Sequence, residues 1–477
     1  MSTPPPDTHR AAARSKMPLA EQIETTYQRI GVTSAHRQIV FMILLGVFFD
    51  ALEQNAVGIT GPILRESWGL DASGIGFLNT MTFTATALGR VATGLIVDRF
   101  GRRNMLTVNL LIFAVGSLLC AFAPNYGVLA AGRFIVGFGL GGEIAVAVIM
   151  MAEFFSAKHR GTAVGLINVT AAGLGNMLAP AFGILVFTLI DGPDKWRWVF
   201  GLLFLPAILV LWFRRYVPET PRYLAATGQI DKANEVLGRL ATGKLAGPAP
   251  TTEQYIASPE LAAAAGVASA GNSWRKVFTR KLLPRTSLLV IAVGMSYAAQ
   301  ISMLTLMPMI LVAQGYAVNT SLWFTLLMQA GSLLGAISAS VVANRFPRKL
   351  VLTVAAALGC FSGLAIALLG SNILFVLIFG VIFNYSIIVL NTTIWLFAPE
   401  QYPTKVRGFG TSIILAAGSL SGGLFPLVTG AVFDAGGLTA MFSVMAGLFV
   451  ILAISVQFVP ETFGKPLEED NDAIYGH

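Results

Sequence analysis

Five ionisable side chains lie inside long apolar runs, where their types and spacing favour chemistry: Asp50, Glu53, Arg90, Arg133 and Glu143. If these runs cross a bilayer, each charge costs roughly 2.5–3.5 kcal/mol even on the lenient insertion scale, so such residues usually mark a functional site. Asp50 and Glu53 are three residues apart, which puts both carboxylates on one face of a helix. Because neighbouring carboxylates repel each other, one of them can hold a proton at neutral pH.

The expected depths of these charges follow from about 1.5 Å of rise per helical residue. Asp50, Glu53, Arg90 and Glu143 are expected to share a layer near the middle of the membrane, with Arg133 close to the outer surface. On depth alone, Arg90 is predicted to pair with Glu143. Arg90 is otherwise a counter-ion, a two-pronged clamp for a substrate carboxylate, or a side chain that extends to the membrane interface.

All five charges fall in the first half of the sequence, and the predicted helices of the second half carry none apart from boundary groups such as Glu400. Any proton or charge coupling is therefore predicted in the first half. The alternative is a set of static pairs in which each carboxylate is neutralised by an arginine.

Composition identifies the elements that must position these residues. The chain has 477 residues, of which 55% are hydrophobic and 12% charged, and its mean hydropathy is +0.71. A soluble protein of this length needs more charge to cover its surface. Apolar runs of about 20 or more residues recur, and each is long enough to cross a bilayer as a helix. These observations predict an all-α integral membrane protein.

Twelve membrane-spanning helices are predicted in two sets of six. The first set lies at about 39–64, 74–97, 104–123, 127–154, 160–190 and 196–216. The second set lies at about 286–314, 319–343, 350–370, 372–399, 405–433 and 436–459. The predicted units are a tail at 1–38, six-helix bundles at 39–216 and 286–459, a connection with short helices at 217–285, and a tail at 460–477.

Within the first tail, Leu19, Ile23, Tyr27 and Ile30 recur at helical spacing. This pattern predicts a short amphipathic helix on the inner membrane surface. A weakly ordered tail is the alternative. The connection is predicted to be helical from Pro221 to Leu240 and linker-like beyond it.

The net charge of +8 is unevenly distributed, because most Lys and Arg fall in the two tails and in the connections on one side of the membrane. The positive-inside rule then places both termini in the cytoplasm, and the charge does not indicate a nucleic-acid partner. Cys120 and Cys360 lie within predicted spans, and the four histidines show no metal-ligand spacing. The sequence predicts no cofactor, no metal and no catalytic nucleophile, and hence no enzyme.

The sequence also contains an internal duplication. Gly89–Arg103, GRVATGLIVDRFGRR, is matched about half a chain later by Gly335–Lys349, GAISASVVANRFPRK. Glu153-x6-Arg160-Gly161 is matched by Glu400-x6-Arg407-Gly408, and Pro218-Glu219-Thr220 by Pro460-Glu461-Thr462. Motifs repeated at nearly one offset predict two parallel six-helix bundles, the architecture described for major facilitator transporters.

These motifs resemble the major facilitator superfamily over nearly the whole chain, and in particular its sugar-porter-like branch. The span-7 region MSYAAQISM has only Gln300 where sugar porters usually carry a Gln-Gln pair, and Asn391-Thr392-Thr393 stands where they carry Gly-Pro before Trp395. Phe48–Glu53 and Gly141-Gly142-Glu143 are more similar to bacterial nicotinate carriers and metabolite–proton symporters. That resemblance implies small, often aromatic, carboxylate substrates and a pairing of Asp50 with Arg133.

A second class of candidates lies at predicted helix ends on the cytoplasmic side, where charged residues could pair between the bundles when an inner gate is shut. Each exposed pair contributes only about 0.2–1 kcal/mol, and the acids can also cap helix N-termini. Asn344 and Pro347 replace the acid and glycine of the first copy, which predicts a weaker latch there. The gate candidates are Gly89, Asp98, Arg99, Gly101, Arg102, Arg103, Glu153, Arg160, Glu219, Arg222, Asn344, Arg348, Glu400, Arg407 and Glu461.

Uncharged polar and aromatic residues of the second half are the candidates for a substrate pocket, although each could instead join helices to one another. They are Tyr297, Gln300, Gln329, Asn384, Tyr385, Asn391 and Trp395.

The sequence thus predicts a secondary transporter, and not an enzyme, that takes up a small organic acid with protons by alternating access. Its partners are the substrate, protons and the bilayer, and it is predicted to be a monomer in a bacterial-type inner membrane. A sugar–proton symporter, an exporter of organic cations or drugs, and a membrane receptor that transports nothing remain alternatives.

Overall fold

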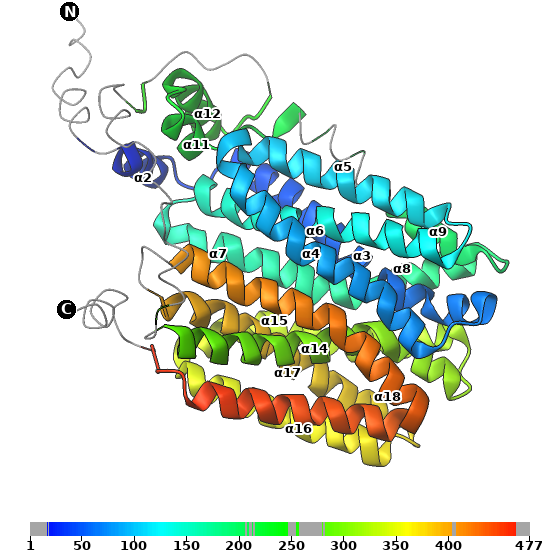
Figure 1. Cartoon of the computed structure of the whole chain (residues 1–477). Helices are drawn as coiled ribbons and strands as arrows, with labels where there is room; N and C mark the ends of the chain where they lie inside the picture. Colours follow the sequence, from blue (N-terminus) through cyan, green and yellow to red (C-terminus); the bar gives the residue numbers. More distant parts are fainter. Residues whose placement is uncertain are drawn as a thin grey trace, which may run out of the picture.

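The computed structural model describes residues 19–205, 215–246, 282–402 and 407–463, together with Met17, Ile208, Trp212, residues 254–256 and Thr279. The predicted tails at 1–38 and 460–477, the connection at 217–285 and the sixth span at 196–216 therefore lie partly outside the described residues. Within the described part, all regular structure is helical (Figure 1).

The helices of the first half follow one another with short turns between them. They are α3 (Ser34–Trp68), α4 (Ala72–Phe100), α5 (Arg102–Ala121), α6 (Tyr126–Phe154), α7 (Ala157–Asn168), the π-helix η1 (Val169–Gly175), α8 (Asn176–Leu189) and α9 (Lys195–Leu202). Because α7, η1 and α8 are continuous, they form one predicted span. The sixth predicted span begins as α9, and part of its remainder lies outside the described residues.

The helices of the second half are α14 (Leu283–Ala313), α15 (Val318–Arg345), α16 (Arg348–Leu369), α17 (Ile373–Glu400) and α18 (Arg407–Gln457). The last of these contains two helices, since Gly437 has non-helical angles of φ 67° and ψ −161° in its middle. Ten stretches of the described residues are long and apolar enough to cross a membrane. With α18 divided at Gly437 and α9 opening the sixth span, the predicted twelve-helix fold is confirmed.

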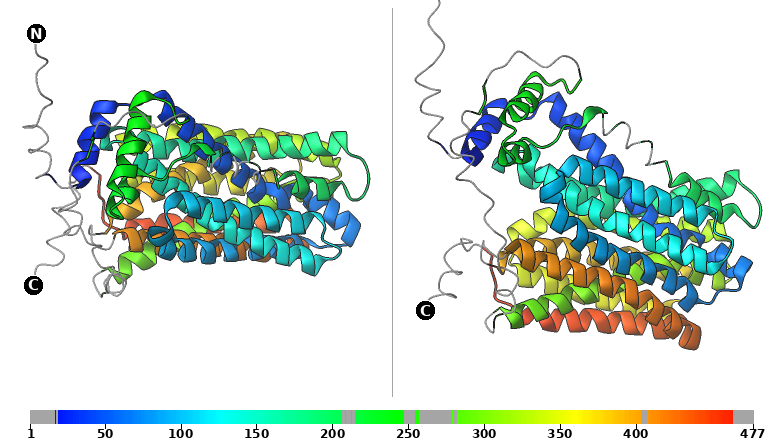
Figure 2. Two further views of the ribbon diagram at one scale, coloured as in Figure 1. Left: turned by 90° about the horizontal axis from the view of Figure 1, so that it is seen from above. Right: turned by 45° about the horizontal axis from the view of Figure 1, so that its top comes forward.

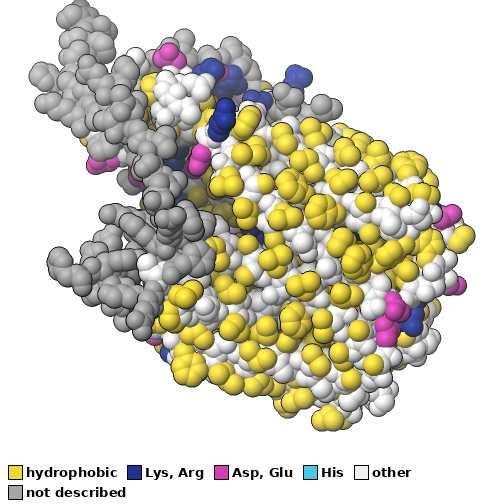
Figure 3. Space-filling view, viewed as in Figure 1, with side chains coloured by type: hydrophobic (Ala, Val, Ile, Leu, Met, Phe, Trp, Pro, Cys, Tyr) yellow, Lys and Arg dark blue, Asp and Glu magenta, His cyan; other side chains and the backbone are white. Residues whose placement is uncertain are grey.

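The two halves lie side by side, with α3 to α9 above and α14 to α18 below in Figure 1. The short helices α2 (Leu19–Ile30), α11 (Pro221–Ala226) and α12 (Ile230–Thr242) gather at one end of the first half, and this end is called the α2 end below (Figures 1 and 2). On the face seen in Figure 3, hydrophobic side chains cover the middle of the molecule and charged side chains appear toward its ends. Leu95 and Leu368 are 79% and 78% exposed, as suits a surface that contacts lipid.

The predicted amphipathic helix is present as α2, but its expected position on the membrane surface is wrong. Leu19, Ile23 and Tyr27 are buried against the protein, where α2 contacts α11 and α12. The Tyr27 hydroxyl donates a hydrogen bond of 2.9 Å to the Glu153 carbonyl at the end of α6. The apolar face of α2 is therefore covered by the protein's own helices and not by lipid.

Close contacts between the halves run along α4 and α18. At the end opposite α2, the Asp434 carboxylate accepts hydrogen bonds from the backbone N–H groups of Ala72 and Ser73, at 3.3 and 3.2 Å. Further along, the Thr80 hydroxyl donates to the Gly423 carbonyl at 2.7 Å. Arg90 makes a further contact between the same two helices. Gly94, one turn further along α4, has open space where a side chain would begin.

Candidate functional site

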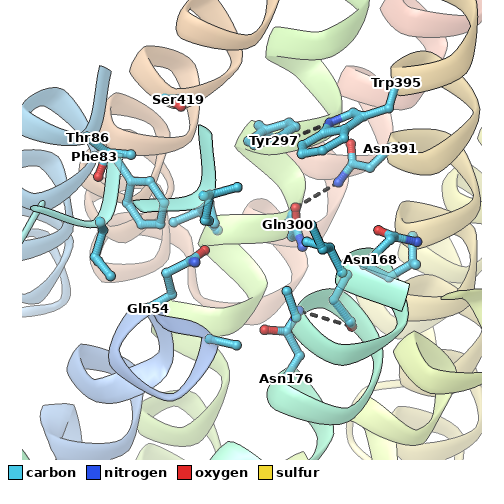
Figure 4. A pocket seen from close by; sticks show the side chains of 18 of the residues that line it. Gln54, Phe83, Thr86, Asn168, Asn176, Tyr297, Gln300, Asn391, Trp395 and Ser419 are labelled. Atoms are coloured by element: carbon cyan, nitrogen blue, oxygen red, sulfur yellow. Dashed lines mark hydrogen bonds between the residues drawn. The ribbon is translucent and has the colours of Figure 1, made fainter. Parts of the chain in front are cut away.

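A cavity of about 100 Å³ lies between the two halves, with room for several water molecules. Residues of α3, α4, α6, α7, η1 and α8 line it from the first half, and residues of α14, α17 and α18 from the second (Figure 4). Ala171 and Ala172 of the π-helix are among them. π-helical turns inside α-helices are frequent at functional sites, because they displace the side chains that follow.

Arg90 is the one charged residue among the described residues that line the cavity. The backbone of α4 at Arg90 packs closely on α6, since a Cβ at Gly141 would lie 2.9 Å from the backbone nitrogen of Arg90. The Nη1 group of Arg90 crosses to the second half and donates to the Leu415 carbonyl and to the Ser419 hydroxyl, each at 3.1 Å. The expected pair between Arg90 and Glu143 is therefore wrong.

Four of the predicted pocket residues line the cavity, and hydrogen bonds fix their orientation (Figure 4). The Trp395 indole N–H donates to the Tyr297 hydroxyl at 3.2 Å. The Asn391 amide donates to the Gln300 side-chain oxygen at 2.7 Å, and Ser296 donates to the Asn391 oxygen at 2.7 Å. The second half thus presents an aromatic pair beside a chain of amides.

The other three predicted pocket residues are not part of the cavity lining. The Gln329 oxygen accepts a bond from Ser332 one turn along α15, and the Asn384 amide donates to the Gly380 carbonyl one turn back on α17. The Tyr385 hydroxyl accepts a bond from Ser338, which joins α17 to α15. Their polar groups are satisfied within and between these helices, as the alternative interpretation allowed.

Several lining residues were not predicted from the sequence. Gln54, Asn168 and Asn176 bring three more carboxamides to the cavity from the first half. Asn168 donates to Thr392 of α17 at 2.9 Å, and Asn176 accepts from Asn55 at 3.0 Å. Phe83, Thr86 and Ser419 complete the labelled set in Figure 4. Polar residues within apolar runs were the available signal, but the sequence does not show which face of each helix meets the cavity.

Behind the cavity, Arg133 pairs with Glu53, and both side chains are fully buried. Arg133 also donates to the Thr82 hydroxyl at 3.0 Å, and Ser117 donates to the second Glu53 oxygen at 3.3 Å. The expected difference in depth between Glu53 and Arg133 is wrong, because α3 begins at Ser34, before its predicted start at 39, and this raises Glu53 to the level of Arg133. The pairing with Asp50 implied by the family resemblance is also not present.

Asp50 lies in a separate buried group with Glu143, whose carboxyl group is its neighbour. Both residues are at most 1% exposed. Apart from each other's carboxyl group, neither the Asp50 oxygens nor Oε2 of Glu143 has a hydrogen-bond partner among the described residues. Gly46 faces this group from α3, since a Cβ there would lie 2.8 Å from Oε1 of Glu143. Asp50 and Glu53 therefore serve different clusters although they share α3.

At the α2 end, the two halves contain matching clusters. In the first half, Arg102 pairs with Glu153 at 3.0 Å, the Thr220 hydroxyl bonds to Glu153, and Glu219 accepts the backbone N–H groups of Arg102 and Arg103. The same arrangement in the second half uses Arg348, Glu400, Thr462, Glu461 and the N–H groups at positions 348 and 349, with an ion-pair distance of 2.9 Å. The capping of helix N-termini expected for the acids is thus present for Glu219 and Glu461.

The ion pairs that the structure describes in these clusters join elements of the same half, and ion pairs between the bundles when an inner gate is shut stay a prediction. Asp98 pairs with Arg102 at 2.8 Å, and Glu24 of α2 contacts Arg222 at 2.9 Å and Arg160 at 3.7 Å. The side chains of Asn344 and Arg407 lie outside the described residues, so the predicted weaker latch stays a prediction.

The remaining gate candidates have backbone roles. Gly101 has φ 88° in the turn between α4 and α5, a conformation that glycine adopts without strain. The Arg99 carbonyl accepts a bond from the Tyr223 hydroxyl at 3.1 Å. Gly89 packs on the Phe138 backbone of α6, which leaves no room for a side chain, and its part in a gate stays a prediction.

The two capping acids differ in their electrostatics. Burial raises the pKa of Glu219 above its ordinary value, although bonds from three backbone N–H groups oppose the shift. Burial acts in the same direction on Glu461, but bonds from four backbone N–H groups outweigh it and lower its pKa. Among the described residues, no group of three or more His, Cys, Asp or Glu side chains could hold a metal ion.

Two parallel sets of helices around a polar cavity define a multi-pass membrane transporter for a small molecule. The family model described as "Sugar (and other) transporter" matches residues 30–473, and the chain belongs to this family. It is not an enzyme family.

Relatives with assigned substrates agree with this class. The chain is 31% identical to the "Niacin transporter NiaP" of Acinetobacter baylyi, over 95% of this chain and 99% of that one. It is 26% identical to the "4-hydroxybenzoate transporter PcaK" of the same organism, over 91% and 92% of the two chains. The inward-open structure of the xylose transporter XylE from E. coli superposes with a TM-score of 0.69 and 20% identity, covering 91% of this chain and 98% of that one, and so shares the fold.

Proposed function

We propose that this transporter carries a small organic carboxylate, coupled to protons, by alternating access. The observation that carries the proposal is the positive charge of the cavity. Arg90 is the one charged side chain among the described residues that line it. A guanidinium that is shielded from bulk water attracts a carboxylate and can bind both of its oxygens. The same charge disfavours an organic cation, since no described lining residue is acidic.

The uncharged part of the cavity favours a flat ring with polar substituents. Trp395 and Tyr297 provide aromatic surface on one side, and Phe83 lies across the cavity from them in Figure 4. Aromatic pairs are worth about 0.5–1.5 kcal/mol beyond the area they bury. Five carboxamides supply hydrogen-bond donors and acceptors: Gln54, Asn168, Asn176, Gln300 and Asn391. Niacin and 4-hydroxybenzoate, named for the two relatives above, are both aromatic carboxylates.

The proton is assigned to the buried carboxyl groups of the first half. Glu53 is balanced by Arg133, whereas Asp50 and Glu143 have no cationic partner in the described structure. Two ionised carboxylates without partners would cost far more in a buried site than one protonated pair. Asp50 and Glu143 are therefore proposed to share a proton that is taken up on one side of the membrane and released on the other.

The orientation follows from the charge distribution of the sequence. The basic connections and both tails are proposed to face the cytoplasm, so that the α2 end is the cytoplasmic end of a monomeric transporter in the cell membrane. The hydrogen bonds from Ala72 and Ser73 to Asp434 join α4 and α18 at the opposite end, which supports access to the cavity from the α2 end in this conformation.

Uptake into proteoliposomes tests the proposal. The panel contains benzoate, nicotinate and 4-hydroxybenzoate, with xylose and glucose as sugars and tetraethylammonium as a cation, each with and without an inward proton gradient. We expect gradient-driven uptake of at least one carboxylate. Uptake of sugars alone would support a sugar–proton symporter, uptake of the cation alone a cation carrier, and binding without any uptake a receptor.

A further inference from the structure

Arg90 belongs to the first half, but its hydrogen bonds are made to the second. Its Nη1 group donates to the Leu415 carbonyl and the Ser419 hydroxyl, one turn apart on α18, at 3.1 Å each. The Ser419 hydroxyl in turn donates to the Leu415 carbonyl at 3.2 Å, so the two acceptors form one unit. The second half thus fixes the direction in which the guanidinium points.

These bonds leave the other edge of the guanidinium for a ligand. Nε and Nη2 of Arg90 make no hydrogen bond with the described residues, and the side chain lines the cavity together with Ser419. A guanidinium binds a carboxylate best through two parallel N–H bonds from one edge. With Nη1 occupied by α18, the edge formed by Nε and Nη2 is the one that remains.

The position of Arg90 along α4 makes these bonds sensitive to the arrangement of the halves. Thr80 bonds to Gly423 in the packed part of the α4–α18 contact, whereas Gly94, one turn beyond Arg90, has no neighbour where a side chain would begin. Arg90 therefore lies between a close contact of the two helices at Thr80 and an uncovered glycine at position 94. A small movement of α18 away from α4 would remove both acceptors at once.

We propose that the carboxylate site is assembled by both halves, with Ser419 and the Leu415 carbonyl acting as positioning groups for Arg90. The inference rests on the proposed function, because it takes the ligand to be a carboxylate. A ligand shifts a conformational equilibrium only by its difference in affinity for the two states. Since the guanidinium is oriented only while α18 lies against α4, carboxylate binding favours the arrangement in which these helices are together.

The test compares Ser419→Ala with Ser419→Thr, which keeps the hydroxyl, and with Ser443→Ala, whose hydroxyl bonds within its own helix at an exposed position. Uptake of benzoate, nicotinate and 4-hydroxybenzoate into proteoliposomes is measured for each. We expect Ser419→Ala to raise KM for the transported carboxylate about 3- to 10-fold, the range expected for loss of one ordinary hydrogen bond, because Ser419 positions Arg90 and does not itself bind the ligand; the maximal rate should change little. Ser419→Thr and Ser443→Ala should keep the original KM.

A second readout follows the distance between the halves. Spin labels are placed at Phe100 and Phe346, which are exposed at the ends of α4 and α15, in a background with Cys120 and Cys360 replaced by alanine. Adding the transported carboxylate should shift the distance distribution toward shorter values in the parent chain and in Ser419→Thr. The shift should be reduced in Ser419→Ala at equal ligand concentration.

The outcomes separate this inference from the proposed function. If the parent chain transports no carboxylate, the proposed function fails. If it transports one and Ser419→Ala keeps both the original KM and the full distance shift, the carboxylate site does not depend on α18 and this inference fails alone. A lower maximal rate with unchanged KM would also overturn it.

Discussion

The first half contains all five ionisable residues predicted within the membrane, and one of them, Arg90, lines the cavity between the halves. The second half contributes uncharged polar and aromatic side chains to that cavity: Tyr297, Gln300, Asn391, Trp395 and Ser419. The two halves share one architecture, and at the α2 end they even repeat one cluster of side chains. Near the middle of the membrane they have diverged. A duplicated scaffold can thus keep its intramembrane charges in one copy while both copies line the cavity with uncharged side chains.

Arg90 is where this division breaks down. It is a first-half residue that depends on second-half acceptors, and it is separated from the Glu53–Arg133 pair and from the Asp50–Glu143 pair. The comparison therefore makes distinct predictions for a static ion pair, for an anion site, for a proton site and for the repeated clusters.

The largest effect is expected on stability, from Glu53→Gln. This change leaves Arg133 buried without a counter-charge, which should cost about 3–5 kcal/mol. Thermal unfolding in detergent measures the loss. The matched control is Glu53→Gln combined with Arg133→Gln, which removes both charges and should recover much of the stability. Equal instability of the single and double variants would show that the pair does not act through charge balance.

The next largest effect is expected from Arg90→Gln, which removes the charge of the cavity while keeping a polar side chain. A two-pronged bond to a charged group is worth roughly 1.5–3 kcal/mol, so carboxylate uptake should fall about 10- to 150-fold in the ratio of maximal rate to KM. Arg90→Lys keeps the charge but cannot donate two parallel hydrogen bonds, so its uptake should lie between that of Arg90→Gln and that of the parent chain. If Arg90→Gln transports carboxylates normally, the assignment of the anion site to Arg90 of the first half is contradicted.

A smaller effect is expected for the proton site. Asp50→Asn and Glu143→Gln should abolish accumulation driven by a proton gradient, which for one proton and a gradient of one pH unit is about tenfold. Exchange of labelled for unlabelled carboxylate without a gradient should continue, because the cavity is intact. Accumulation that persists in both variants would contradict the assignment of the proton to this pair.

The smallest effect is expected at the α2 end, where the clusters are alike but the capping acids are not. The lowered pKa of Glu461 means that its ionised form stabilises the fold at pH 7, and this contribution is lost as the pH falls below the ordinary value of 4.5. The raised pKa of Glu219 has the opposite sign, since protonation on lowering the pH relieves the cost of burying its charge.

Glu461→Gln should therefore lower the unfolding temperature at pH 7 by the equivalent of less than about 1 kcal/mol, and Glu219→Gln should not. The difference should shrink as the pH is lowered below 4.5, and it should vanish only once the pH has passed below the depressed pKa of Glu461. If Glu219→Gln is the more damaging variant at pH 7, backbone capping outweighs the burial of charge at that position.

Much of this protein was determined by its sequence. Apolar runs long enough to cross a bilayer specify helices whatever their neighbours are, since unpaired backbone groups are too costly in lipid. The repeated motifs that contain Arg102, Glu153 and Glu219 identify matching helix ends in the two halves, because each motif is short and lies at or just after the end of a helix. The same patterns identified the buried charges and four residues of the cavity.

Only the tertiary structure decided which of these residues meet. Gln300 lines the cavity and Gln329 does not, although both are glutamines within apolar helices. Glu53, and not Asp50, binds Arg133, and Arg90 reaches across to α18. Such pairings depend on the rotation and relative height of helices, which close contacts at positions such as Gly141 set to within a side chain's width. The sequence specifies the faces of each helix, but the partner of each face is chosen by packing.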